Sequence, residues 1–176
     1  MPNTFQLIAS STVGAGGAAS IDFTSIPSTY TDLVLKVSGR SSASYTRRVL
    51  QLTMNGSSSS SDYSDRYLYG SGSAAGSGAD NVGSQPYILV WDLNAATSTA
   101  NTFGNIDIYI PNYASTTTYK SVSADGASED NATTIYMGLT AGLYLQNTAI
   151  TSLSLKTDSG NFVQYSTAYL YGVKNA

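Results

Sequence analysis

Apolar and polar residues alternate along several short stretches of the chain. Between residues 32 and 37, Leu33, Leu35 and Val37 alternate with mostly polar neighbours. Successive side chains of an extended strand point to opposite faces, so this stretch predicts a strand with one face in a core. The same pattern recurs at residues 103–111, where every second residue is isoleucine.

Proline, glycine and asparagine divide these stretches. Pro27 has no N–H for a sheet and predicts a corner between strands at 21–23 and 32–40. Another apolar stretch at 47–54 ends at Asn55-Gly56, a strong turn signal. We expect this stretch and the strand at 32–40 to form an antiparallel hairpin or to lie close to one.

Two further segments carry their own predictions. Residues 57–84 are rich in serine and glycine and predict flexible loops around one short strand, within the domain and not as a linker. Residues 86–91 are apolar on both faces and predict a central strand, and the nine residues after them predict a helical turn or an ordered loop.

The pattern as a whole predicts an all-β protein. About ten short strands with a turn signal every eight to twelve residues or so are typical of a sandwich or barrel. No stretch shows a convincing helical period, and no repeat of fixed length is present. We therefore expect a single antiparallel, jelly-roll-like β-sandwich over residues 1–176, in which residues 1–20 supply the N-terminal strand and a small-residue loop.

Charge and composition narrow the range of partners. Charged residues make up 11% of the chain and its net charge is −3, with no basic stripe, which argues against nucleic acid as a partner. No segment approaches the roughly 20 consecutive apolar residues of a membrane span. The first residues lack the pattern of a signal peptide, so we expect synthesis and folding in a cytosol.

Catalytic chemistry has few residues available. Histidine and cysteine are absent, which excludes Ser–His–Asp, Cys–His and histidine- or thiolate-based metal sites. The carboxylate pairs Asp62/Asp65 and Glu129/Asp130 lie in segments rich in serine and glycine, which we expect to be loops. Carboxylates in such loops are ordinarily solvated surface groups. Asp125 near the second pair lacks the ligand spacing of a calcium loop. We predict a protein without enzymatic activity, metal or cofactor.

Tyrosine is the residue type that suggests a binding surface. Fourteen are present, and we take a set of them together with one arginine as interface candidates. These candidates are Tyr63, Arg66, Tyr67, Tyr69, Tyr109, Tyr113 and Tyr119. The alternative is that tyrosines spaced along strands form half-buried cross-strand pairs. The sequence leaves both interpretations open.

Five segments carry a resemblance to a known class of proteins: "FTSIPSTYTDLVLKVSGRSS", "LTMNGSSSS", "RYLYGSGS", "IDIYIPNYAST" and "FVQYSTAYLYGVKNA". From about residue 5 to the C-terminus, the chain resembles short virion structural proteins of tailed bacteriophages, including marine phages and cyanophages. The resemblance implies a virion component made in the cytoplasm of a host bacterium.

The role that this resemblance implies is a capsid decoration, cement or head-fibre protein. Such a protein would bind the assembled shell of the major capsid protein at the capsid surface, and analogy with other jelly-roll virion proteins suggests a homotrimer. The alternative is a tail-fibre or spike module that recognises a host surface glycan. A glycan hydrolase built on Asp62, Asp65, Glu129 or Asp130 is the weakest of the three interpretations.

Overall fold

The computed structural model describes residues 4–131 and 136–174, and its regular structure is almost entirely β-strand. One short 3-10 turn, η1 (Ser60–Asp62), is the helical element within these ranges. It is far too short to cross a membrane. The strands are β1 (Phe5–Thr12), β2 (Ser20–Phe23), β3 (Asp32–Gly39), β4 (Arg47–Met54), β5 (Tyr63–Ser71), β6 (Ala74–Asp80), β7 (Ile88–Asn94), β8 (Gly104–Ile110), β9 (Lys120–Ser128), β10 (Tyr136–Tyr144), β11 (Leu153–Thr157) and β12 (Thr167–Val173).

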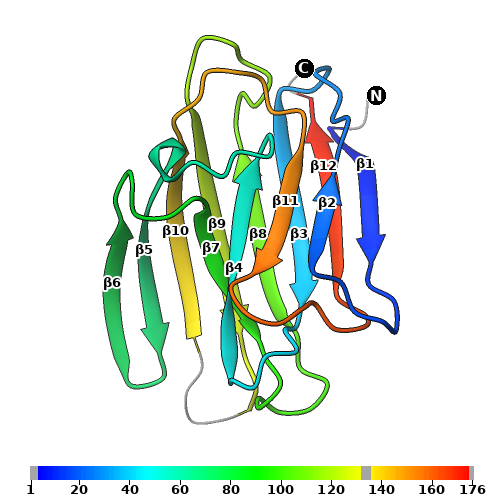
Figure 1. Ribbon diagram of the computed structural model, residues 1–176, viewed down its shortest axis with the longest axis vertical. Helices are drawn as coiled ribbons and strands as arrows, with labels where there is room; N and C mark the ends of the chain where they lie inside the picture. The colour runs from blue at the N-terminus through cyan, green and yellow to red at the C-terminus, as the bar shows by residue number, and fades with distance from the viewer. Residues whose placement is uncertain (1–3, 132–135, 175–176) are drawn as a thin grey trace.

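The strands form two antiparallel sheets that pack face to face (Figure 1). The large sheet has eight strands in the order β1-β12-β3-β8-β9-β10-β5-β6, and the small sheet has four in the order β2-β11-β4-β7. The chain alternates between the sheets from β1 to β4 and again through β7, β8, β11 and β12. This alternation is the jelly-roll arrangement, so the predicted fold class is confirmed, with twelve strands in place of about ten.

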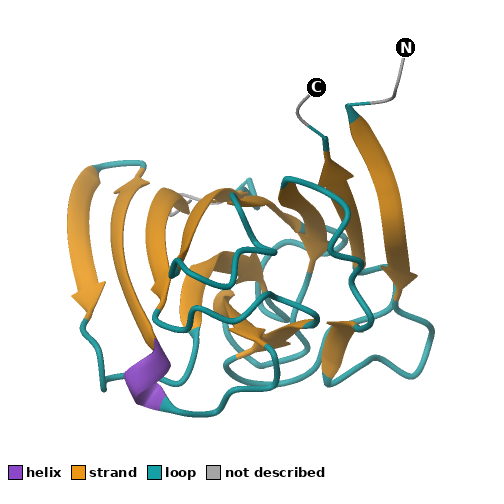
Figure 2. Cartoon of the chain, turned by 90° about the horizontal axis from the view of Figure 1, so that it is seen from above, coloured by secondary structure: helices purple, strands orange, loops and turns teal. Residues whose placement is uncertain are grey.

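Two strand pairs extend the jelly roll on one side. β9–β10 and β5–β6 add to the large sheet next to β8, and this sheet therefore overhangs the small one. Figure 1 shows β5 and β6 beyond the small sheet on one side and β1 beyond it on the other. Seen from above, the pair attached to η1 stands at one end of the molecule and the β1–β12 pair at the opposite end (Figure 2).

The core lies between the sheets and follows the alternation of the sequence. Leu33, Leu35 and Val37 of β3 are buried, as predicted, and pair with a strand whose isoleucines are buried as well. On the small sheet, β4 contributes Leu50 and Leu52 to the same core. Full burial of one such side chain contributes about 1.5–3 kcal/mol to stability, so this interior holds the fold without disulfides.

The predicted hairpin between residues 32–40 and 47–54 is wrong, although the Asn55-Gly56 turn is present. Both residues have positive φ, 52° and 67°, as the turn requires. β3 and β4 nevertheless belong to different sheets, because β4 pairs with β11 and β7. The Asn55 side chain instead holds another loop, since its Oδ1 accepts a 2.8 Å hydrogen bond from the N–H of Thr151.

The short strand predicted within residues 57–84 is present as β5, whereas part of the loop predicted after it is a second strand, β6. The two strands form an antiparallel pair. Gly78 and Gly76 of β6 lie directly opposite Tyr67 and Tyr69 of β5. A Cβ on either glycine would collide with the facing tyrosine ring. Glycine here allows a close approach inside a strand, whereas we interpreted it as a sign of a loop.

The strand predicted at residues 86–91 exists as β7, but it is an edge strand of the small sheet and not a central one. Its apolar character on both faces has a local cause. The Trp91 ring packs into a hollow of the large sheet over Gly126 and Gly138, which face each other across β9 and β10. The loop that follows β7 is ordered and non-helical, and Arg40 donates hydrogen bonds to three of its carbonyls, those of Ser98, Thr99 and Thr102.

Candidate functional site

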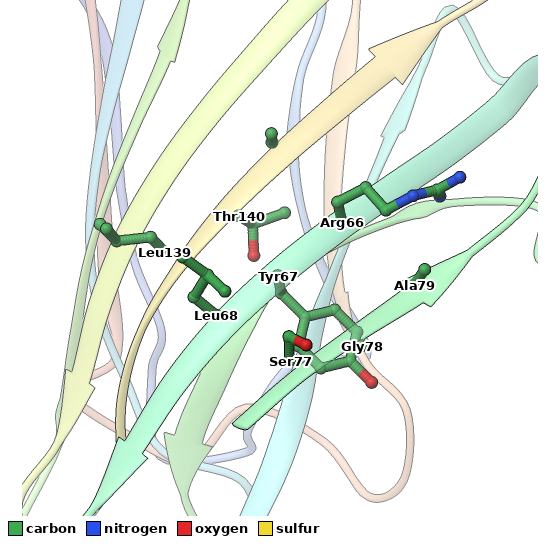
Figure 3. Close-up of a pocket in the computed structure, with 9 residues that line it drawn as sticks. Arg66, Tyr67, Leu68, Ser77, Gly78, Ala79, Leu139 and Thr140 are labelled. Atoms are coloured by element: carbon green, nitrogen blue, oxygen red, sulfur yellow. The ribbon is translucent and has the colours of Figure 1, made fainter. Parts of the chain in front are cut away.

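The outer face of the large sheet, which points away from the small sheet, carries a cluster of exposed apolar side chains. Leu68 of β5 is 60% exposed, and Met137 and Leu139 of β10 are 67% and 58% exposed. Leu68 and Leu139 are direct partners in the strand register, and Figure 3 shows them side by side. We call these three residues the apolar patch. Patches of this kind mark interaction sites on soluble proteins.

The surface around the apolar patch is hollowed on two sides. A hollow of about 570 Å³ lies between the two leucines, Arg66 and small residues such as Ala79 and Ala141. A second one, of about 410 Å³, lies beside Met137. These small side chains point to the same face of the sheet as the leucines and leave space beside them. The surface thus offers protruding apolar groups with recesses next to them, a shape suited to another protein surface.

A different site lies beside the edge of β7, on the inner side of the overhang. A cleft of about 270 Å³ lies there, lined by four aromatic side chains: Tyr67 and Tyr69 of β5, Tyr136 of β10 and Trp91 of β7. Arg47, Val49, Leu89 and Asp92 complete its lining. We call it the tyrosine cleft. The ring centroids of Tyr67 and Trp91 are 6.4 Å apart, and those of Tyr69 and Tyr136 are 6.1 Å apart.

The charges of the tyrosine cleft are paired with each other. Arg47 of β4 forms an ion pair with Asp92 of β7. Its guanidinium also lies 3.5 Å from the centroid of the Tyr136 ring. Burial raises the pKa of Asp92, and Arg47 acts in the opposite direction. Among the described residues that line the cleft, this pair leaves no free cation to hold an anionic ligand.

Asp65 of β5 lies deep beside this cleft and joins the two sheets. Its side chain is buried, and its Oδ2 accepts a 3.0 Å hydrogen bond from the N–H of Leu89 on β7. Its Oδ1 has no partner among the described residues. Burial raises the pKa of Asp65 to about 6, and the negative charge of Asp80 on β6 adds to the shift.

Two of the predicted interface residues lie in the core. Tyr63 is 1% exposed, and its hydroxyl accepts a 3.1 Å hydrogen bond from the N–H of Met54. Tyr113 is fully buried and donates its hydroxyl proton to the carbonyl of Pro27. Both side chains stabilise the interior, so neither is available to a partner in this fold.

The other five candidates are spread over separate surfaces. Arg66 points to the outer face, whereas Tyr67 and Tyr69 point to the inner side and enter the tyrosine cleft. Tyr109 stands on the outer face of β8 and donates a 2.8 Å hydrogen bond to Oδ2 of Asp32. Tyr119 is exposed in the loop before β9. The seven residues therefore do not form one site.

The carboxylates considered for catalysis or ion binding have separate environments. Asp62 accepts hydrogen bonds from Gln146 at 2.7 Å and from Ser57 at 2.5 Å. The Glu129 side chain accepts one from the N–H of Asn131 at 2.7 Å. Within residues 4–131 and 136–174, no three acidic side chains gather in an arrangement that could hold a metal ion.

Sequence reasoning singled out Tyr67 and Tyr69 of the tyrosine cleft, but it missed the apolar patch and the other residues of the cleft. The apolar patch depends on the pairing of β5 with β10, and the tyrosine cleft joins β4, β5, β7 and β10. Leu68 between Tyr67 and Tyr69 was the available signal, because alternation assigns it to the opposite face from both tyrosines.

Comparison with known proteins adds no relative. No protein-family model matches the chain, and no curated protein is significantly similar to it. A jelly roll hosts many functions, so the fold class alone does not assign one. The surfaces described above are the basis on which a function can be argued.

Proposed function

We propose that this chain is a non-enzymatic structural protein of a bacteriophage virion, which attaches to the assembled shell of the major capsid protein. The observation that carries the proposal is the apolar patch, where Leu68 and Leu139 face outward together from neighbouring strands. Isolated exposed leucines are ordinary, but a contiguous group flanked by recesses favours a protein partner. The resemblance to tailed-phage virion proteins supports the same class.

Attachment to a lattice would use this patch in many copies. Burying one leucine side chain in an interface contributes about 1.5–3 kcal/mol before the cost of ordering is subtracted. A single patch is therefore a weak anchor, and a homotrimer on a three-fold axis would engage three of them at once. Because such a protein binds the assembled shell and not its free subunits, it stabilises the shell by its own binding free energy.

A second candidate function is the receptor-binding module of a tail fibre or spike. The observation that favours it is the tyrosine cleft, whose aromatic rings and paired charges resemble a small-ligand site more than a lattice contact. Position on the particle and number of copies separate this candidate from the first one.

The test is attachment to particles that lack the protein. Leu68→Ser and Leu139→Ser each remove an outward apolar group from a strand whose inward face is unchanged. We expect each variant to bind at least about tenfold more weakly, since 1.4 kcal/mol corresponds to a factor of ten. Val82→Ser is the matched control, because Val82 is 50% exposed in the loop after β6 and outside the patch. Equal binding by all three variants would contradict the proposal.

A further inference from the structure

The tyrosine cleft has the properties of a preorganised binding site. The rings of Tyr67 and Tyr69 lie against Gly78 and Gly76 of β6, and a Cβ at either glycine would overlap the ring. The Tyr136 ring is held by the guanidinium of Arg47. Aromatic side chains fixed in this way lose little conformational entropy when a ligand binds.

Hydrogen-bonding groups are present and only partly used. Trp91 is 4% exposed and lines the cleft, yet its indole N–H has no partner within the described ranges. The indole nitrogen is closed to solvent, so the Trp91 ring lies beside a ligand in the cleft without offering it this donor. Asp92 and Arg47 add an acceptor and donors at the same place.

The electrostatics exclude some ligand classes. Burial raises the pKa of Tyr67, and the nearby carboxylates of Asp80, Asp65 and Asp92 add to the shift. Among the described residues that line the cleft, Arg47 is the one cation, and it is already paired with Asp92. A phosphate or carboxylate ligand would therefore meet net repulsion, and an uncharged ligand would not.

We propose that the tyrosine cleft binds the pyranose ring of a neutral saccharide. The C–H face of a pyranose packs on the tyrosine rings, while its hydroxyls exchange hydrogen bonds with Arg47 and Asp92. The cleft volume of about 270 Å³ suits one ring with neighbouring sugars extending outward. The cleft and the apolar patch lie on opposite faces of β5 and β10, so this proposal does not rest on attachment to a capsid.

Trp91 makes the test direct, because it is the only tryptophan in the chain. The intact protein is titrated with the methyl glycosides of glucose, galactose, mannose and N-acetylglucosamine and with their β-linked disaccharides. The readouts are the tryptophan fluorescence and the single indole N–H cross-peak in a proton–nitrogen NMR spectrum. We expect a saturable change in both with at least one neutral sugar, because a sugar ring in the cleft changes the surroundings of the Trp91 ring.

Variants connect the signal to the cleft. Tyr69→Ala removes one of the tyrosine rings on which the sugar packs. The ring of Tyr69 pairs with Tyr136, whereas Trp91 pairs with Tyr67. We expect at least tenfold weaker binding by this variant. Tyr169→Ala, on the outer face at the far end of the large sheet, is the control and should bind like the parent. If Tyr69→Ala fails to fold, the indole shift in the parent protein still decides the question.

Two results would overturn the proposal. One is the absence of any indole shift with all of these neutral sugars. The other is a response to choline chloride or to inorganic phosphate that equals or exceeds the response to sugars, since this would assign the cleft to a cation or an anion. Neither result bears on binding by the apolar patch, so failure here is distinguishable from failure of the proposed function.

Discussion

The carboxylate of Asp65 on β5 accepts a 3.0 Å hydrogen bond from the N–H of Leu89 on β7. Since β5 belongs to the overhang of the large sheet and β7 is the edge of the small sheet, this bond joins the two sheets at Leu89, which lines the tyrosine cleft. The carboxylate is buried, its second oxygen has no partner among the described residues, and Asp80 faces it across the β5–β6 pair. Asp65 thus joins the sheets through a buried carboxylate whose charge opposes stability.

This arrangement predicts a pH dependence of stability. The pKa of Asp65 is about 6 in the folded protein and 3.8 for an ordinary aspartate, so the folded state holds the proton more tightly. The contribution of Asp65 to the free energy of unfolding should therefore decrease as pH rises through this window, by about 2–3 kcal/mol. The measurement is urea unfolding at several pH values between 3.5 and 8 (about half-unit steps).

Asp65→Asn isolates that contribution. The amide keeps an acceptor for the Leu89 N–H and removes the buried charge. We expect this variant to be more stable than the parent at pH 7 and to lack the decrease between about pH 4 and 6. Asp125→Asn, an exposed change on β9, should retain the pH profile of the parent. Identical pH profiles for Asp65→Asn and the parent would contradict this assignment.

Gly138→Ala tests how Trp91 is seated. An added Cβ at Gly138 would overlap the Trp91 ring, so the ring has to leave its present position over β10. We expect a loss of about 1–3 kcal/mol, the usual cost of overpacking a core. Gly70→Ala on β5 is the control, because the nearest atom to its added Cβ is 3.8 Å away. Denaturant unfolding of both variants gives the comparison, and equal stability would contradict the described packing.

Arg40→Met tests the loop after β7. Arg40 is 9% exposed and donates hydrogen bonds of 2.8, 2.8 and 3.0 Å to the carbonyls of Thr99, Thr102 and Ser98. Without Arg40 the carbonyls of Ser98 and Thr102 lose this donor, while that of Thr99 still accepts from Thr102. We expect a loss of about 3 kcal/mol together with faster hydrogen exchange at residues 95–103.

The control for Arg40 is a surface arginine. Arg48 lies 3.3 Å from Asp158 in a partly exposed pair, and such pairs contribute about 0–1 kcal/mol. Arg48→Met should therefore cost less than about 1 kcal/mol in the same unfolding experiment. If Arg40→Met were equally mild, the buried hydrogen bonds would not be holding the loop.

Much of the fold could be predicted because the alternation of the sequence is local. The buried face of β3 and the isoleucines of β8 follow directly from a period of two. β6 could not be predicted this way, since Gly76 and Gly78 belong to a strand only because tyrosine rings of β5 cover them. The sheet to which β4 belongs depends on β11, about a hundred residues further along the chain.

The candidate surfaces were less predictable for the same reason. Tyr63 and Tyr67 are four residues apart on one strand, and the first lies in the core while the second lines a cleft. The difference is set by what covers each position: Tyr63 packs on Tyr144 and contacts the end of β4, whereas Tyr67 lies on the overhang. Burial of this kind is a property of the packed sheets and leaves no local signature.

Attachment to the capsid lattice in many copies can be tested by the number of copies of this chain per virion. Quantitative mass spectrometry of purified virions gives the ratio of this chain to the major capsid protein. We predict a ratio between about one to three and one to one, as three-fold or capsomer-wide occupancy of a closed shell requires. A ratio of about a few per cent or less would contradict lattice attachment and assign the chain to the tail or to a single vertex.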